Sequence, residues 1–150
     1  MYKDLCEDEV LFSAEYITHN IPSNAHKTTF EWMRHAEALI RKYAKAKFVI
    51  TSRIHCALPC LGVETPVIFI SSEVLKGDSL RSSGRFGGLI DQLNVLEFDL
   101  GFAGRSTQMV DLLKSGKLSS TSSFENPITY KEYRDRMIET VRSFIHHQSL

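Results

Sequence analysis

Residues 47–70 read KFVITSRIHCALPCLGVETPVIFI, with two short apolar runs on either side of a helix-length segment. Continuous apolar runs at residues 48–50 and 67–70 are typical of strands that are covered on both faces of a parallel sheet. The stretch therefore predicts a β-α-β unit. Open α/β sheets bind their ligands at the carboxyl ends of such strands. Because Ser52, Arg53 and His55 follow the first strand directly, we expect them at this edge of the sheet.

The segment between these strands predicts a helix over about residues 54–61. Ser52 is suited to cap its start, and Gly62 is suited to end it. Pro59 removes an amide donor from the helix interior and clashes with the carbonyl group of His55, so we expect a late start or a kink.

The remaining chain alternates strand and helix signals. Residues 10–17, VLFSAEYI, predict a further strand, which would place His19 at the same sheet edge if the sheet is parallel. A solvent-exposed loop histidine is the alternative for His19. Thr28 and Glu31 form a capping-box pattern before an amphipathic helix. The sequence also predicts a strand over residues 95–98 and short helices over residues 86–93 and 107–113.

Two segments have the composition of loops or linkers. Residues 71–88 are rich in Ser and Gly and carry Lys76, Arg81 and Arg85, which could close over an anionic ligand or form a solvated basic loop. Residues 115–126 predict a flexible linker. Asn126 and Pro127 then predict the start of a last amphipathic helix over residues 127–147.

Length and composition favour one intracellular domain. The 150 residues include 18 Lys and Arg against 18 Asp and Glu, so no charge excess points to nucleic acid. No apolar run is long enough for a membrane span, and the first residues do not resemble a signal peptide. Cys6, Cys56 and Cys60 are an odd number without disulfide spacing, which favours the cytoplasm. Since only His55 lies near the last two cysteines, we predict no metal site.

Residues 46–70 resemble the polysaccharide pyruvyl transferase family. The likeness rests on a strand, a Thr-Ser-Arg-Ile-His turn, a helix of small residues and a Gly-x-x-x-Pro-Val-Ile entry into the next strand. Members of this family transfer a pyruvyl group from phosphoenolpyruvate to sugar hydroxyls as a ketal, and their two domains are arranged as in GT-B glycosyltransferases. The resemblance implies that residues 1–150 form a Rossmann-like carboxyl-terminal domain, an α/β fold with a mostly parallel sheet flanked by helices.

The resemblance also implies roles for individual residues. His55 would be the general acid or base, and Arg53 would hold the anionic groups of phosphoenolpyruvate. Ser52, His19, Lys76, Arg81 and Arg85 would contribute to substrate binding, and no cofactor is expected. The partners would be phosphoenolpyruvate, a sugar or polysaccharide acceptor, and the first domain or a second subunit.

Three alternatives stay open at this point. His55 could cap the helix while Arg53 forms a surface ion pair. The chain could also be a non-catalytic module or remnant that binds an anion. A GT-B glycosyltransferase would instead place a nucleotide sugar at the same sheet edge.

Overall fold

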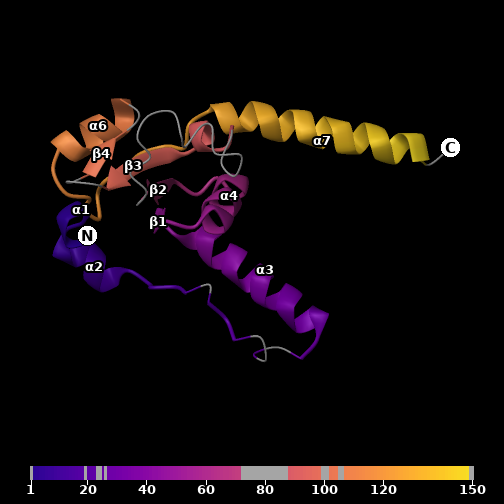
Figure 1. Cartoon of the computed structure of the whole chain (residues 1–150), viewed down its shortest axis with the longest axis horizontal. Helices are drawn as coiled ribbons and strands as arrows, with labels where there is room; N and C mark the ends of the chain where they lie inside the picture. Colours follow the sequence, from indigo (N-terminus) through magenta and orange to yellow (C-terminus); the bar gives the residue numbers. More distant parts are fainter. Residues whose placement is uncertain are drawn as a thin grey trace.

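A four-stranded sheet lies at the centre of the computed structural model, in the order β1-β2-β3-β4 (Figure 1). The structure describes residues 2–18, 20–22, 25, 27–71, 88–98, 102–104 and 107–148. The strands are β1 (Val49–Thr51), β2 (Val67–Ser71), β3 (Asn94–Phe98) and β4 (Phe102–Gly104). The first three are parallel, and β4 runs antiparallel to β3. The predicted α/β class with a mostly parallel sheet is confirmed.

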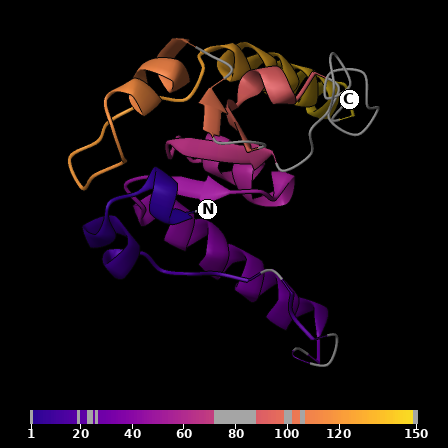
Figure 2. The ribbon, with the colours of Figure 1, turned by 60° about the vertical axis from the view of Figure 1, so that its left-hand side comes forward.

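Helices cover both faces of this sheet (Figure 2). Their order along the chain is α1 (Tyr2–Leu5), α2 (Asp8–Ser13), α3 (Thr29–Lys45), α4 (Ile54–Gly62), the 3-10 helix η1 (Ile90–Gln92), α6 (Thr107–Lys114) and α7 (Thr129–Gln148). The expected helix over residues 107–113 is thus confirmed as α6. Of the helix expected over residues 86–93, the described part forms only the single turn of η1.

Strand β2 alternates its side chains between two apolar cores. Val67 and Phe69 pack with α4, with η1 and with Tyr43 of α3 on one face. Ile68 and Ile70 pack on the other face with α1, with α6 and with Leu118 and Phe124 of the following segment. All five residues of β2 are buried, which explains why its sequence is a continuous apolar run ending in Ser71.

The predicted strand over residues 10–17 is wrong. Residues up to Ser13 belong to helix α2, whose first turn carries Asp8 and Glu9 next to its free amide groups. The Ser13 hydroxyl donates a hydrogen bond to the Glu9 carbonyl group at 2.9 Å, so this backbone carbonyl of the short helix has a partner. Phe12 is 89% exposed, so its apolar side chain does not indicate a buried strand here. Residues 14–18 pair with none of the strands that the structure describes.

The segment before α7 is packed along part of its length. Leu118 is buried, its N–H donates to the Leu5 carbonyl group at 2.8 Å, and its carbonyl group accepts from Glu7 N–H at 2.9 Å. Phe124 is also buried and lies against Phe48, with ring centroids 5.7 Å apart. The flexibility expected for residues 115–126 stays a prediction.

Asn126 joins this segment to the start of β2. Its Oδ1 accepts a hydrogen bond from Val67 N–H at 2.9 Å, and its Nδ2 donates to the Thr65 carbonyl group at 2.8 Å. The prediction that Asn126 and Pro127 begin the last helix is therefore wrong. Helix α7 begins at Thr129, because the Asn126 amide is used to satisfy backbone groups at the entry to β2.

Replacing Asn126 by alanine should lower the free energy of unfolding by about 1–3 kcal/mol, because the amide of buried Val67 loses its partner. Urea denaturation of the variant against wild type measures this loss. Ser123→Ala is the matched control, since Ser123 is exposed in the same segment. Equal stability of the two variants would contradict the assigned role of Asn126.

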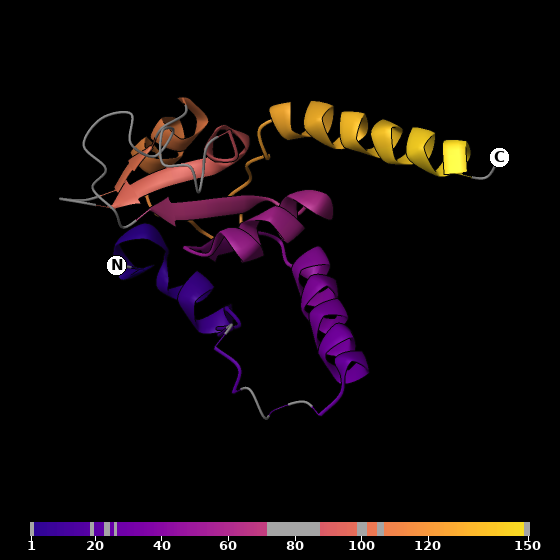
Figure 3. The same cartoon turned by 45° about the vertical axis from the view of Figure 1, so that its right-hand side comes forward.

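The long helices α3 and α7 extend away from the sheet in different directions (Figure 3). Thr28 and Glu31 form the predicted capping box at the start of α3. The far part of α3 carries Phe30 and Met33, which are 68% and 66% exposed. Met137 and Phe144 on α7 are similarly exposed. Both helices therefore present apolar side chains that the described part of this chain does not cover.

Among the described residues, no helix combines the length and the apolar character that crossing a bilayer requires.

Candidate functional site at the carboxyl end of β1

The turn after β1 carries the residues that the sequence predicts as the site. Thr51, at the end of the strand, is buried, and its Oγ1 accepts a hydrogen bond from the backbone N–H of Arg53 at 3.0 Å. Ser52 and Arg53 are exposed in this turn. Thr51 therefore fixes the backbone while the next two side chains are left accessible to a ligand.

Arg53, and not Ser52, occupies the N-cap position of α4. Its carbonyl group accepts hydrogen bonds from the N–H groups of Cys56 and Ala57, both at 3.0 Å. The Arg53 side chain makes no capping hydrogen bond to this helix end. The predicted N-cap role of Ser52 is thus wrong. The backbone N–H of Arg53 is bonded to Thr51 Oγ1, and the helix begins at Ile54, one residue later than a Ser52 cap would require.

Pro59 lies inside α4, which still runs from Ile54 to Gly62. The proline has no N–H, so it cannot donate to the carbonyl group of His55 as a helical residue would. The helix predicted over about residues 54–61 is thus confirmed as α4, and it ends at Gly62 as predicted. Gly62 is the last helical residue, and Glu64 takes the left-handed conformation that turns the chain, with a φ of 61°.

His55 and Arg53 line the same groove, between α4 and α3. This groove has a volume of about 380 Å³, and its other walls come from Pro59 and from the apolar residues Ala36, Leu39, Ile40 and Tyr43 of α3. His55 is exposed in the first turn of α4. The geometry therefore places an imidazole ring and a guanidinium group next to an apolar wall at a helix N-terminus.

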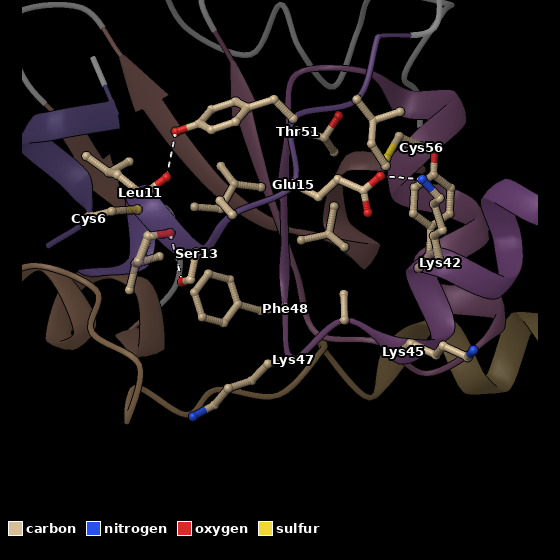
Figure 4. Close-up of a pocket in the computed structure, with 18 of the residues that line it drawn as sticks. Cys6, Leu11, Ser13, Glu15, Lys42, Lys45, Lys47, Phe48, Thr51 and Cys56 are labelled. Atoms are coloured by element: carbon tan, nitrogen blue, oxygen red, sulfur yellow. Dashed lines mark hydrogen bonds and ion pairs between the residues drawn. The ribbon is translucent and has the colours of Figure 1, made fainter. Parts of the chain in front are cut away.

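Arg53 also borders a second, larger groove on the other side of the turn. This groove has a volume of about 910 Å³ and is lined by residues 48–53, by residues 13–18 and by the last turns of α3. Figure 4 shows Thr51 and Cys56 in its wall and the ion pair between Glu15 and Lys42 across it. Ser52 lines this second groove and not the first, whereas Arg53 and Tyr43 line both.

Positive charge surrounds the larger groove. Lys42, Lys45 and Lys47 line it together with Arg53, and Glu15 is its acidic residue. Lys42 is paired with Glu15, and Lys47 donates a hydrogen bond to the carbonyl group of Ser120. Basic residues are common in the last turn of a helix. The sequence alone therefore does not reveal that these lysines border the site. An anion that enters the turn at Arg53 meets a cationic surface.

Buried thiols lie directly behind the turn. The hydrogen bond with Cys56 and burial raise the pKa of the Cys60 thiol above its ordinary value of 9.0. Burial and a hydrogen bond with Cys56 likewise raise the pKa of the Tyr43 hydroxyl group. Cys60 and Tyr43 are thus protonated at neutral pH. They support the turn by packing and do not supply a nucleophile.

Alkaline conditions should therefore destabilise the fold. Above pH 9 the unfolded chain releases the Cys60 proton while the folded chain retains it, so stability falls by up to about 1.4 kcal/mol per pH unit for this group. Urea denaturation between pH 8 and 10.5 in a reducing buffer measures the slope. Cys60→Ala should flatten it, so that the stability difference from wild type shrinks as pH rises. A constant difference would show that Cys60 titrates alike in both states.

Four of the predicted site residues, His19, Lys76, Arg81 and Arg85, lie outside the described residues. Their part in the site stays a prediction. Within the described ranges, no group of three or more His, Cys, Asp and Glu side chains is placed to hold a metal ion.

In comparisons with known proteins, the chain matches a family model. Neither the curated proteins nor the solved structures include a match to this chain. A family model described as polysaccharide pyruvyl transferase matches residues 3–73, a region that contains α3, β1, α4, β2 and the turn with Arg53 and His55. Apart from Ser120, the residues that line the two grooves lie in this matched region, so this part of the chain is similar to the polysaccharide pyruvyl transferase family.

Proposed function

We propose that the chain acts in pyruvyl transfer from phosphoenolpyruvate to a sugar hydroxyl during the biosynthesis of cell-surface polysaccharides. The observation that carries this proposal is that Arg53 and His55 line one groove at the carboxyl end of β1. This turn lies inside the region that matches the family. Phosphoenolpyruvate carries a carboxylate and a phosphate, and one guanidinium group can donate two parallel hydrogen bonds to either of them.

The proposed chemistry needs a proton at one carbon atom of phosphoenolpyruvate. One acceptor hydroxyl adds to C2 while the methylene carbon gains a proton and becomes a methyl group. A second hydroxyl then displaces phosphate from C2, and its proton leaves with the phosphate, which completes the ketal. His55 can supply or remove these protons, because imidazole is the side chain that most often acts as general acid or base. Arg53 would hold the anion so that C2 faces the acceptor.

The first turn of α4 supports the same assignment. Its free amide groups and the positive end of the helix dipole favour a negative charge beside Arg53. Ser52, on the larger groove, would add a hydroxyl group to the binding surface. We assign Lys76, Arg81 and Arg85 to substrate binding on their sequence positions after β2, and His19 on its position after residues 14–18, which line the larger groove.

We infer that residues 1–150 act as the carboxyl-terminal, Rossmann-like domain of a GT-B-like enzyme and that a further domain or subunit completes the site. The exposed apolar residues of α3 support this view, because Ile40 belongs both to that exposed surface and to the wall of the groove with His55. A body that packs on α3 would therefore cover the groove. The three free cysteines favour a reducing, cytoplasmic location.

Thermal unfolding with added ligands tests the substrate class. Phosphoenolpyruvate should raise the melting temperature in a saturable manner, because a ligand that binds only the folded state stabilises it. A nucleotide sugar and pyruvate serve as comparisons. Stabilisation by the nucleotide sugar alone would favour a glycosyltransferase, and no response to millimolar phosphoenolpyruvate would contradict the proposal. Binding without transfer in the presence of the completing domain would indicate a non-catalytic anion-binding module.

A further inference from the structure

The outer edge of β1 faces residues 14–18 across the larger groove. Among the described strands, β1 is the first in the sheet order, and it pairs only with β2. The groove of about 910 Å³ has residues 48–53 in one wall and residues 13–18 in the other. Figure 4 shows Ser13, Glu15, Phe48 and Thr51 among the residues that line it. The groove is therefore a space beside a free sheet edge.

The backbone of Ile50 presents hydrogen-bonding groups to this groove. Val49 N–H donates to the Pro66 carbonyl group at 2.9 Å, and Val49 and Thr51 pair with β2. Successive backbone groups of a strand face opposite sides, so the N–H and carbonyl groups of Ile50 face the free edge. An edge of this kind is a template for one more strand.

Residues 14–18 begin with an extended residue and have the composition of such a strand. Ala14 is extended, with φ −72° and ψ 137°, and Tyr16 and Ile17 are residue types that strands favour. Within the described residues, no backbone hydrogen bond joins this segment to another element. Side-chain interactions hold it in place. The Tyr16 hydroxyl donates a hydrogen bond to the Leu11 carbonyl group at 3.3 Å, and Glu15 forms an ion pair with Lys42.

The order of elements along the chain fits a parallel pairing. Residues 14–18 are followed by α3 and then by β1, and Tyr43 and Leu39 of α3 pack into the core beside β1. A strand, a crossover helix and a parallel strand form the usual β-α-β unit. Figure 1 shows the segment running from α2 toward the start of α3, on the side of the molecule where β1 lies.

We propose that residues 14–18 dock on the free edge of β1 as a fifth strand, parallel to β1, and so close the larger groove. The backbone groups of Ile50 then gain partners. The docked segment carries Thr18 to the carboxyl edge of the sheet, beside Ser52 and Arg53. Closing and opening of this strand thereby sets how accessible Arg53 is from the larger groove.

Amide hydrogen exchange of Ile50 by NMR tests the docking without any ligand. The double variant Tyr16→Pro with Ile17→Pro keeps an extended backbone but removes two successive amide donors. It should speed exchange of the Ile50 amide roughly tenfold or more, while the amide of buried Leu96 stays protected as a marker of the fold. Ile21→Pro, outside the segment, is the matched control and should leave Ile50 protected.

Two results would overturn the proposal. One is an Ile50 amide that exchanges at the rate of an unprotected peptide in wild type. The other is an Ile50 rate that the double variant leaves unchanged, or that Ile21→Pro raises equally. If the double variant loses protection of the Leu96 amide, the variant is no longer folded. Nuclear Overhauser contacts in the wild type then decide whether the segment is docked. Contacts between residues 14–18 and 48–52 in a parallel ladder support the docked strand, and their absence contradicts it.

Discussion

His55→Ala should lower kcat for pyruvyl transfer by about 10²–10⁴-fold, the usual contribution of a positioned general acid or base. The reason is that His55 is an exposed imidazole that shares a groove with Arg53. The assay follows phosphate release and ketal formation in an enzyme assembly that contains this chain. Because the side chain is exposed, its removal should leave the melting temperature nearly unchanged.

Matched variants separate the two proposed roles. His146→Ala removes another exposed histidine, on α7, and should leave kcat unchanged. Arg53→Lys keeps the charge but loses the planar fork, so it should mainly raise KM for phosphoenolpyruvate. Undiminished transfer by His55→Ala would exclude an acid or base role for this residue. A KM unaffected by Arg53→Lys would exclude a two-bond contact.

The largest loss of stability is expected from Leu96→Ala. Leu96 in β3 is fully buried and packs with Ile68 and Ile70 of β2 and with Met109 of α6. Truncation of such a residue removes apolar contacts and leaves a cavity, so the free energy of unfolding should fall by about 2–5 kcal/mol. Urea denaturation measures the change. Val141→Ala, on the exposed face of α7, is the control and should change stability by less than about 0.5 kcal/mol.

A small effect of Leu96→Ala, similar to that of Val141→Ala, would show that the second apolar core is not packed as described. Such a result would also remove the support for the sheet edge that carries Arg53, since β2 joins β3 to β1. The stability measurement and the kinetic measurement thus test different parts of the same account.

The central sheet could be predicted from sequence because its signals are local and consistent. The apolar run at residues 67–70 is buried, and so are Val95 and Leu96 in the strand predicted over residues 95–98, so composition alone indicates both strands. The capping box at Thr28 is equally local. Residues 8–13 and β4 were not predictable in this way. Phe12 faces solvent, and the short β4 depends on pairing with β3 rather than on its own three residues.

The candidate site was predictable in part. The turn with Arg53 and His55 follows from the position of a strand end, which the sequence indicates. The walls of the grooves do not follow from it. Tyr43, Lys42 and residues 13–18 reach the turn only through tertiary packing of α3 and of the segment after α2. Asn126 is a similar case, because its partners Thr65 and Val67 lie about 60 residues earlier in the chain.

The most direct measurement is an NMR titration of the side chains with phosphoenolpyruvate, observing the guanidinium Nε–H of Arg53 and the imidazole ring of His55. The account predicts that both signals shift together and saturate, while the ring of His146 on α7 does not respond. Arg53→Lys should weaken the response of His55. Saturable shifts that spare Arg53 and His55, or no shifts at millimolar phosphoenolpyruvate, would contradict the claim that this turn binds the anionic substrate.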